Sequence, residues 1–329
     1  MAELATAAGG TSPADLERQL EQYRRELTGY CYRMLGSAFE ADDAVQETMV
    51  RAWRSFDRFE GRSSVRSWLY RIATNVCLDM LRGRQRRARP MDFGPSSPGT
   101  ETPVATRGEV TWLEPIPDAK VLSDAADPAE VAVERDSIRL AFVAALQHLP
   151  ARQRAVLILR EVLRWQATEV AELLDTTVVS VNSALQRARA TLAASDLSDG
   201  AAAEPTDDEQ RALLARFIDA FERFDVESLV SLLHDDAVMS MPPFEMWVQG
   251  VNALRDFYRG AGSGCAGSRL TPITGNGMLG FAQYKSDGKG GFTPRAIHLL
   301  DMSDGRIGGL NIFINPELFP LFGLPPQPE

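Results

Sequence analysis

The sequence contains few of the residues on which metal sites, disulfide scaffolds and acid–base catalysis depend. Its 329 residues include only three cysteines and three histidines. Cys31, Cys77 and Cys265 lie far apart and form no CxxC pair, and the histidines lack the spacing of metal ligands. We therefore expect no disulfide framework, no metal and no cofactor, and the cysteine pattern is typical of a reducing cytoplasm.

A long apolar segment is also missing from the sequence. No run is long enough to span a bilayer, and the first residues do not have the charged and apolar parts of a signal peptide. We expect a cytoplasmic protein with no membrane partner.

An excess of positive charge is missing too, because the formal net charge is −10, but the charge is unevenly distributed. Residues 12–90 hold 15 basic and 11 acidic side chains, and residues 146–194 hold 6 and 4. The segment between them has 4 basic and 10 acidic side chains, and the part after residue 194 has 10 and 19. Two basic modules therefore alternate with two acidic segments, and the basic modules are candidates for contact with phosphates.

The first basic module combines two amphipathic helices with an arginine cluster. One apolar stripe at helical spacing consists of Val45, Met49, Ala52, Trp53 and Phe56. A second stripe consists of Val65, Trp68, Leu69, Ile72 and Val76. Five arginines follow between residues 82 and 89, a density expected where a chain lies on phosphates. Taken separately, the helices are also ordinary core-forming elements and the arginines an ordinary solvated face.

In this order the pieces resemble region 2 of the extracytoplasmic-function (ECF) sigma factors, in the sigma-70 family. The matching stretches are DDAVQETMVRAW, FEGRSSVRSWLYRIATNVCLDMLR and the arginines that follow. The resemblance implies a helical domain over residues 12–90 that binds core RNA polymerase through one polar face: Asp42, Asp43, Gln46, Glu47 and Arg51. It also implies contacts to melted −10 promoter DNA from a second set: Arg62, Ser63, Trp68, Tyr70, Asn75, Arg82 and Arg84. Aromatic and amide side chains suit this role, because stacking is worth roughly 1–3 kcal/mol per base.

Residues 91–127 combine Pro, Gly, Ser, Thr and acidic residues with little periodicity, which predicts an extended acidic linker. Within it, Trp112, Leu113 and Pro115 form an apolar motif. We expect this motif to be regulatory and to dock on a neighbouring domain or a partner, because an exposed tryptophan is unfavourable. A local tether onto its own domain is the alternative.

A second helical block is predicted over residues 128–194. It ends in a short helix from Ala167 to Leu174, a turn, and a last helix from Val178 to Leu192, which is the helix-turn-helix arrangement. The segment LPARQRAVLILREVLRWQATEVAELLDTTVVSVNSALQRARATL resembles sigma region 4, which reads the −35 promoter element. Candidate −35 contacts face outward: Thr177, Ser180, Asn182, Ser183, Gln186, Arg187 and Arg189. Since Asn and Gln pair with adenine, we expect base contacts from Asn182 and Gln186, and phosphate contacts from the two arginines.

Residues 195–206 predict a second linker, after which the pattern becomes mixed. Helices are predicted over 213–224, 226–233 and 251–258, a strand over 237–241, and a hairpin of residues 297–302 and 307–314. This order implies an α+β domain over residues 207–329. The helices and the stretch HDDAVMSMPPFEMWVQGVNALRDFY resemble the SnoaL-like branch of the NTF2-like folds, a cone with an internal pocket.

Related SnoaL-like folds include enzymes, so catalysis is an alternative for this domain. Its candidates are His234, Asp235, Asp236 and His298, because acid–base chemistry needs a titratable group in a pocket. The two carboxylates stand at a helix-to-strand junction, where such residues are usually solvated. We therefore expect no catalytic residue and a non-enzyme, while a small-molecule ligand of this domain stays open.

Together these features predict two all-α domains, sigma regions 2 and 4, followed by an α+β SnoaL-like cone. The predicted function is that of an ECF sigma factor, which directs core RNA polymerase to promoter DNA and is modulated by its C-terminal domain. The alternative is a one-component helix-turn-helix regulator with a ligand-sensing domain. That alternative uses only residues 128–329 and leaves residues 41–89 unexplained.

Overall fold

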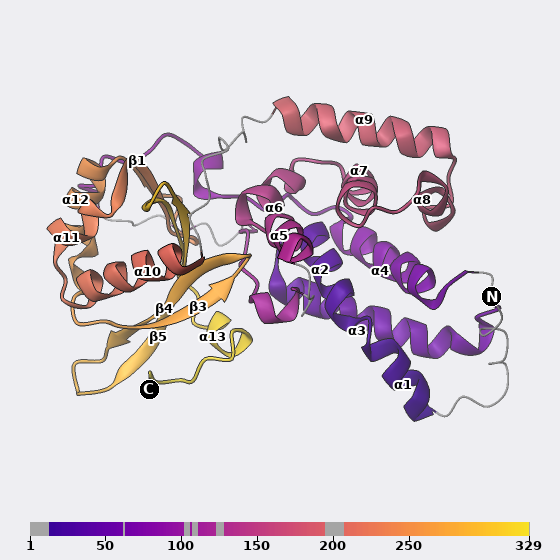
Figure 1. The fold of residues 1–329 in the computed structure, drawn as a ribbon, viewed down its shortest axis with the longest axis horizontal. Helices are drawn as coiled ribbons and strands as arrows, with labels where there is room; N and C mark the ends of the chain where they lie inside the picture. The colour runs from indigo at the N-terminus through magenta and orange to yellow at the C-terminus, as the bar shows by residue number, and fades with distance from the viewer. Residues whose placement is uncertain are drawn as a thin grey trace. The chain divides into compact units, whose positions relative to one another are not determined.

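A computed structural model describes residues 13–61, 63–101, 106, 111–122, 128–194 and 207–328. The described residues form two compact units (Figure 1). The helical unit contains the chain up to Arg84 and most of the second helical block. The α+β unit contains the C-terminal part together with residues 85–119 and 138–144. The predicted division treats residues 91–127 as a separate linker, whereas the described part up to residue 119 packs with the C-terminal domain.

The first part of the helical unit is a bundle in which small residues allow close packing. Its helices are α1 (Pro13–Glu21), α2 (Arg24–Leu35), α3 (Ala38–Ser55), a 3-10 turn (Phe56–Arg58) and α4 (Val65–Leu81). The sequence predicts one helix over about 13–35, but the structure divides it at residues 22–23. Helix α3 buries Ala41, Ala44 and Ala52 and packs against α2, whose buried Tyr30 contacts α4, with its hydroxyl 2.7 Å from that of Thr74.

The second part of the helical unit contains the helix-turn-helix. Its elements are α5 (Pro128–Asp136), α6 (Leu140–Gln147), α7 (Ala151–Leu157), a π-helical turn (Ile158–Val162), α8 (Ala167–Leu173) and α9 (Val178–Ala194). The first residues of α6 belong to the α+β unit. Helix α9 packs on both α7 and α8, the π-helical turn packs on α8, and Leu159, Val170 and Val181 of these elements are buried. The predicted short helix, turn and last helix are confirmed.

The α+β unit is built on a six-stranded sheet of order β2-β1-β6-β5-β4-β3. Its elements are α10 (Asp207–Glu222), α11 (Val226–Ser231), β1 (Leu233–Ser240), β2 (Trp247–Gln249), α12 (Val251–Arg259), a 3-10 turn (Ala261–Cys265), β3 (Arg269–Gly275), β4 (Met278–Ser286), β5 (Phe292–Ser303), β6 (Arg306–Phe313) and α13 (Leu318–Leu321). Neighbouring strands are antiparallel except β1 and β6, which are parallel. The predicted helices and the final hairpin are confirmed.

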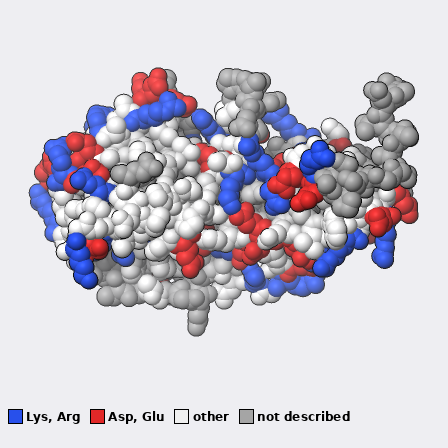
Figure 2. All heavy atoms as spheres, turned by 90° about the horizontal axis from the view of Figure 1, so that it is seen from below, with Lys and Arg blue, Asp and Glu red and all other residues white. Residues whose placement is uncertain are grey.

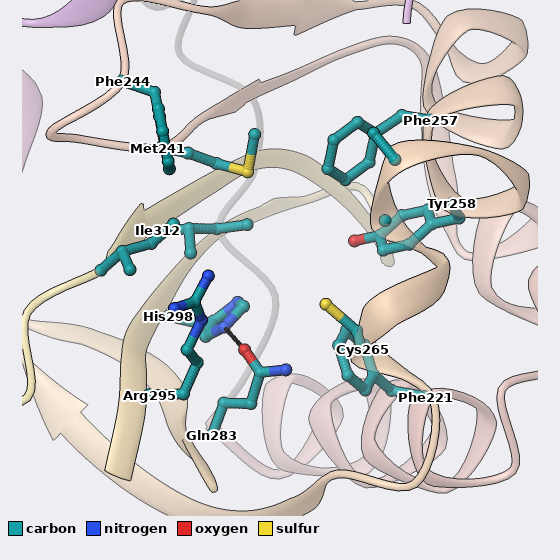
Figure 3. Close-up of a pocket in the computed structure, with 13 residues that line it drawn as sticks. Phe221, Met241, Phe244, Phe257, Tyr258, Cys265, Gln283, Arg295, His298 and Ile312 are labelled. Atoms are coloured by element: carbon teal, nitrogen blue, oxygen red, sulfur yellow. Dashed lines mark hydrogen bonds between the residues drawn. The ribbon is translucent and has the colours of Figure 1, made fainter. Parts of the chain in front are cut away.

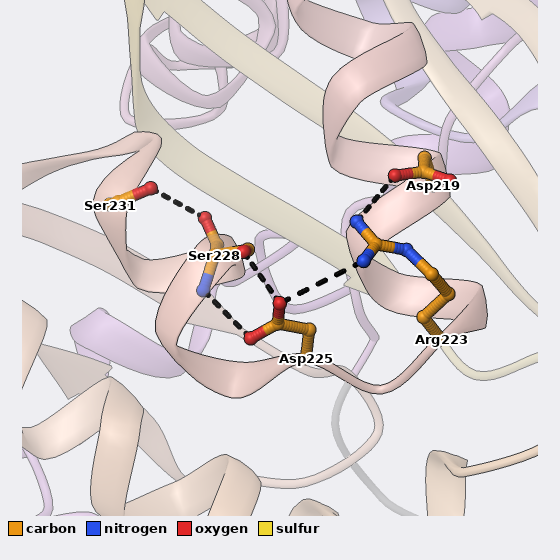
Figure 4. Close-up of polar contacts among 5 residues, drawn as sticks. All are labelled: Asp219, Arg223, Asp225, Ser228 and Ser231. Atoms are coloured by element: carbon orange, nitrogen blue, oxygen red, sulfur yellow. Dashed lines mark hydrogen bonds and ion pairs between the residues drawn. The ribbon is translucent and has the colours of Figure 1, made fainter.

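The junction between α10 and α11 is fixed by a helix cap (Figure 4). The Asp225 carboxylate accepts a hydrogen bond from the Ser228 backbone N–H at 3.1 Å and another from the Ser228 hydroxyl at 2.6 Å. These bonds stabilise the charged carboxylate and lower the pKa of Asp225. Arg223 pairs with Asp219 one helical turn earlier, at 2.5 Å. The cap sets the point at which the chain turns from α10 toward the sheet.

The described part of the predicted linker is attached to the α+β domain by hydrogen bonds between side chains of the domain and backbone groups of the linker. The Trp247 indole N–H donates to the Gly94 carbonyl oxygen at 2.9 Å. Asn276, in the turn between β3 and β4, accepts a bond from the Ile116 N–H at 2.9 Å. Trp112 itself packs within the linker, with its ring centroid 5.5 Å from that of Phe93. The two parts of the apolar motif thus differ. Trp112 packs locally within the linker, whereas the buried residues after it continue to Ile116, which bonds to the α+β domain.

Candidate polymerase and nucleic-acid interfaces

The polar face of α3 is presented to solvent by the way the helix packs. The Ser37 hydroxyl caps α3 by accepting from the Glu40 N–H at 3.2 Å, and the alanines of the opposite face are buried against the bundle. The exposed face carries the predicted polymerase-binding residues: Asp42, Asp43, Gln46, Glu47 and Arg51. Arg51 pairs with Glu47 at 2.6 Å, and Asp42 pairs with Lys120. The three acids Asp42, Asp43 and Glu47 outnumber Arg51 and the paired Lys120, so this face keeps a net negative charge, which suits a protein partner rather than phosphate.

One prediction for α3 is wrong. Trp53 was expected in the apolar stripe, but its side chain is 57% exposed. The helix turns 100° per residue, so Ala52 alone occupies the buried position there, and Trp53 falls beside the polar face.

The N-terminal end of α4 carries a group of aromatic side chains. Ser64 caps α4 by accepting from the Ser67 N–H at 3.1 Å, and Ser63 before it is exposed. Trp68 packs against Phe59 with ring centroids 4.9 Å apart and remains partly exposed. Asn75 is exposed on the same helix. Arg62, also predicted to contact −10 DNA, lies outside the described residues.

Tyr70 departs from the prediction that it contacts a base. Its side chain is fully buried, with its ring centroid 5.1 Å from that of Tyr30 and 5.0 Å from that of Trp165. Burial raises the pKa of the Tyr70 hydroxyl. In this conformation no base can reach it, because position 70 falls on the core-facing side of α4 together with Leu69 and Ala73.

The arginine cluster is less available to phosphate than its density indicates. Arg82 and Arg84 are exposed, although Arg82 pairs with Asp79 and Arg84 with Glu40. The Arg87 side chain is only 8% exposed and lies 3.7 Å from the Glu114 carboxylate. Part of the cluster thus anchors the linker, a role that the sequence could not distinguish from phosphate binding.

The helix-turn-helix presents a polar face on α9. The Thr177 hydroxyl caps the helix by accepting from the Ser180 N–H at 3.2 Å. The predicted −35 contacts are exposed except Ser183, which is partly buried: Thr177, Ser180, Asn182, Ser183, Gln186, Arg187 and Arg189. Arg189 pairs with Glu161 at 2.6 Å. Val179, which the prediction omitted, is 75% exposed beside the cap, where an apolar side chain can contact a thymine methyl group.

Buried arginines join the two parts of the helical unit. Arg154 of α7 donates to the Met34 carbonyl oxygen of α2 and, at 2.7 Å, to the Gln147 side chain. Arg33 of α2 donates to the Ser137 carbonyl oxygen at 3.0 Å and to its hydroxyl at 2.6 Å. Burial lowers the pKa of each arginine to about 10, so both stay charged at neutral pH. Unpairing either would leave a buried charge, which is strongly destabilising.

Helix α4 also contacts the second half of the unit directly. Arg71 donates to the Glu172 carbonyl oxygen of α8 at 2.9 Å, and the Arg66 guanidinium lies over the rings of Tyr70 and Trp165 at 5.3 and 5.4 Å. On the face shown in Figure 2, basic and acidic side chains are interspersed and form no continuous basic surface among the described residues.

The catalytic candidates of the α+β unit are not brought together. His298 lies on β5 and lines an internal pocket, whereas Asp235 and Asp236 are exposed on β1. The His234 Nε2 atom lies 3.0 Å from the Ser303 carbonyl oxygen and does not line that pocket. Within the described ranges, no helix has both the length and the apolar character needed to cross a membrane, and no cluster of possible metal ligands occurs.

Comparison with known proteins assigns each part. Residues 20–87 match the family model for sigma-70 region 2, residues 139–192 that for sigma-70 region 4, and residues 214–308 that for a SnoaL-like domain. The ECF RNA polymerase sigma factor SigG of Mycobacterium tuberculosis is 45% identical, in an alignment that covers 96% of this chain and 87% of that protein. The chain belongs to the ECF sigma factors.

This sigma factor also resembles SigJ of Mycobacterium tuberculosis, which is 28% identical over 92% of both chains. The crystal structure of SigJ has the same fold, with a TM-score of 0.57 at 24% identity over 94% of this chain and all of that one. Like other ECF sigma factors, the protein acts with core RNA polymerase and promoter DNA and is not an enzyme. The predicted family, the fold class and the function as an ECF sigma factor are confirmed, which decides against the one-component regulator.

Proposed function

We propose that this sigma factor binds core polymerase through the exposed polar face of α3, the −10 element through the N-terminal part of α4, and the −35 element through α9. We further propose that the helical unit described above is a resting form. In it, regions 2 and 4 hold each other, and they separate when the promoter is bound. The protein would act in the cytoplasm, where polymerase and promoter meet.

The packing of α4 against region 4 is the observation that supports a resting form. The −10 and −35 elements are named for their positions relative to the transcription start, so they lie 25 base pairs apart. At 3.4 Å per base pair this is about 85 Å along B-DNA. Helix α4 packs on α8, and α8 packs on α9. Packed helices lie about 8–10 Å apart, so the two DNA-binding helices of one closed unit are separated by only a few helix diameters. The unit must open to reach both elements.

The three surfaces differ in their availability before opening. The α3 face and the outer face of α9 are exposed already. Tyr70 and part of the surrounding α4 surface are covered by Trp165. This order supports a sequence in which polymerase binds first and the −10 surface is completed afterwards.

The C-terminal domain is placed in the chain to influence this opening. Residues 85–119 and 138–144 belong to its unit, and in the sequence they directly follow region 2 and begin region 4. Asn276 bonds to both segments, at Ile116 and at Ile138. We infer that the domain modulates activity by setting how much free chain separates the two DNA-binding regions.

Run-off transcription at limiting sigma factor tests the resting form. Trp165→Leu removes the ring that covers Tyr70, whereas Trp165→Phe retains an aromatic ring there. We expect Trp165→Leu to give more transcript than the wild type and Trp165→Phe to resemble it. Binding to core polymerase and to an isolated −35 duplex shows that both variants are folded. Equal or lower transcription by a folded Trp165→Leu would contradict the proposal.

A further inference from the structure

The α+β unit contains a pocket of about 220 Å³ between α10, α12 and the sheet (Figure 3). Its walls are largely apolar and include Phe221, Met241, Phe244, Phe257 and Ile312. At about 30 Å³ for each water molecule in the liquid, the volume corresponds to about seven waters, or one small ring compound. An apolar pocket with a few convergent polar groups is the usual form of a small-molecule site.

The polar end of the pocket is organised by a chain of hydrogen bonds. The Ser268 hydroxyl donates to the Cys265 carbonyl oxygen at 2.7 Å, so it accepts from the Gln283 amide nitrogen at 3.0 Å. The Gln283 side-chain oxygen therefore faces His298 and lies 3.0 Å from its Nε2 atom. The side-chain amide oxygen of Gln283 can only accept, so the Nε2 atom of His298 carries the proton and Nδ1 does not.

This series of hydrogen bonds leaves the Nδ1 atom of His298 as an acceptor without a donor. His298 is 2% exposed, and its Nδ1 atom is buried without a hydrogen-bond partner among the described residues. Burial lowers the pKa of His298 to about 3, so the ring is neutral at physiological pH. Nδ1 is thus a fixed, buried acceptor.

Tyr258 supplies the complementary donor. Its side chain is 2% exposed, and its hydroxyl is likewise buried without a partner in the described part of the chain. Figure 3 shows the hydroxyl oxygen directed toward the middle of the pocket. Burying a polar atom without a partner is unfavourable, so two such atoms in one pocket point to a ligand that satisfies both.

We propose that this pocket binds a compact, uncharged ring compound that carries both a hydroxyl and a carbonyl oxygen. The hydroxyl donates to His298 Nδ1, and the carbonyl oxygen accepts from the Tyr258 hydroxyl. The residues that line the pocket include no carboxylate, and the one cationic residue among them, Arg295, is exposed. The site therefore suits binding and not proton transfer. A ligand bound here would act through the regulatory role proposed for this domain, and its effect on transcription rests on that role.

Titration calorimetry of the full chain with 4-hydroxyacetophenone tests the proposal. We expect saturable binding, and binding weaker by roughly tenfold for acetophenone, which lacks the hydroxyl, and for phenol, which lacks the carbonyl. Ethylbenzene, which has neither oxygen, measures the apolar contribution alone.

Two tyrosine variants separate the site from general effects on folding. Tyr258→Phe should weaken 4-hydroxyacetophenone binding by roughly tenfold and leave ethylbenzene binding unchanged. It should also leave the melting temperature unchanged or higher, because the hydroxyl it removes has no partner. Tyr284→Phe is the control: its hydroxyl bonds to the Pro325 carbonyl oxygen at 2.9 Å outside the pocket, so its loss should lower stability without affecting the probe.

The proposal is overturned if no probe binds saturably, if ethylbenzene binds as tightly as 4-hydroxyacetophenone, or if Tyr258→Phe binds the probe normally. These measurements contain neither polymerase nor DNA. Their failure would leave the transcription result for Trp165→Leu intact, and failure of that result would leave the binding data intact.

Discussion

The side chain of Asn276 donates a hydrogen bond at 2.7 Å to the carbonyl oxygen of Ile138, which precedes it by 138 residues. The same side chain accepts from the Ile116 N–H. Asn276 is fully buried and has a φ of 55°, a left-handed conformation that asparagine tolerates better than most residues. One residue of the C-terminal domain thus holds both segments that lead from region 2 to region 4.

Replacing Asn276 should destabilise the α+β unit. Asn276→Gly keeps the backbone conformation accessible but leaves two buried backbone groups unpaired, each at a cost of about 1–3 kcal/mol. We expect a lower free energy of unfolding in urea and a changed run-off activity. If Asn276→Gly has the same free energy of unfolding as the wild type, the two hydrogen bonds of the Asn276 side chain do not stabilise the unit.

Reversing the charge of the α3 face should abolish binding to core polymerase. Asp43→Arg combined with Gln46→Arg places two cations on an acidic surface without touching the buried face of the helix. Co-purification with core polymerase measures the effect, and circular dichroism checks the fold. Asp208→Arg, a reversal at a 95% exposed side chain of α10, should have no effect. Unaltered co-purification of the double variant would show that the exposed face of α3 does not bind polymerase.

Two exposed residues of α9 should have different effects on DNA binding. Asn182→Ala is expected to cost about 1–3 kcal/mol of discrimination at one −35 position, because it removes a base-edge contact. Arg187→Ala should weaken binding to all sequences equally and reduce the salt dependence by about one phosphate contact. Competition binding on single-base variants of the −35 element separates the two. Uniform weakening by Asn182→Ala would make that residue a backbone contact instead.

The buried histidine should make the C-terminal domain sensitive to acid. The pKa of His298 is about 3 in the folded state and about 6.5 in the unfolded chain, so below pH 6.5 the unfolded state binds more protons. The contribution of the neutral His298 ring to the free energy of unfolding is fully present above pH 6.5. It is lost as the pH falls toward 3, with up to a tenfold change in the folding equilibrium per pH unit.

Thermal unfolding between pH 7.5 and 5 measures this effect. His298→Asn keeps an amide donor for Gln283 and removes the titrating ring, so its melting temperature should depend less on pH than that of the wild type. Equal slopes for the two proteins would contradict the assignment of a neutral buried imidazole.

The sequence predicted periodic elements well and long-range contacts poorly. The helix-turn-helix and the hairpin after Ile297 were predictable because apolar spacing and turn residues are local signals. Tyr70 and Trp53 were misplaced because a helical stripe about 100° wide does not specify which of its edges is covered by other helices. The linker contacts were missed because irregular segments dock by single hydrogen bonds. Asn276 and Tyr258 leave no pattern in the sequence, since their roles depend on partners far along the chain.

A distance measurement shows directly whether regions 2 and 4 are closed on each other until the promoter is bound. Spin labels at Arg54→Cys on α3 and Ala190→Cys on α9 stand on exposed positions of the two regions, with the three native cysteines replaced by serine or alanine. Double electron–electron resonance then gives their separation in the free sigma factor and in the promoter complex with polymerase. We expect a short, narrow distance distribution in the free protein and one longer by several tens of ångströms in the complex. The same distribution in both states would contradict this expectation.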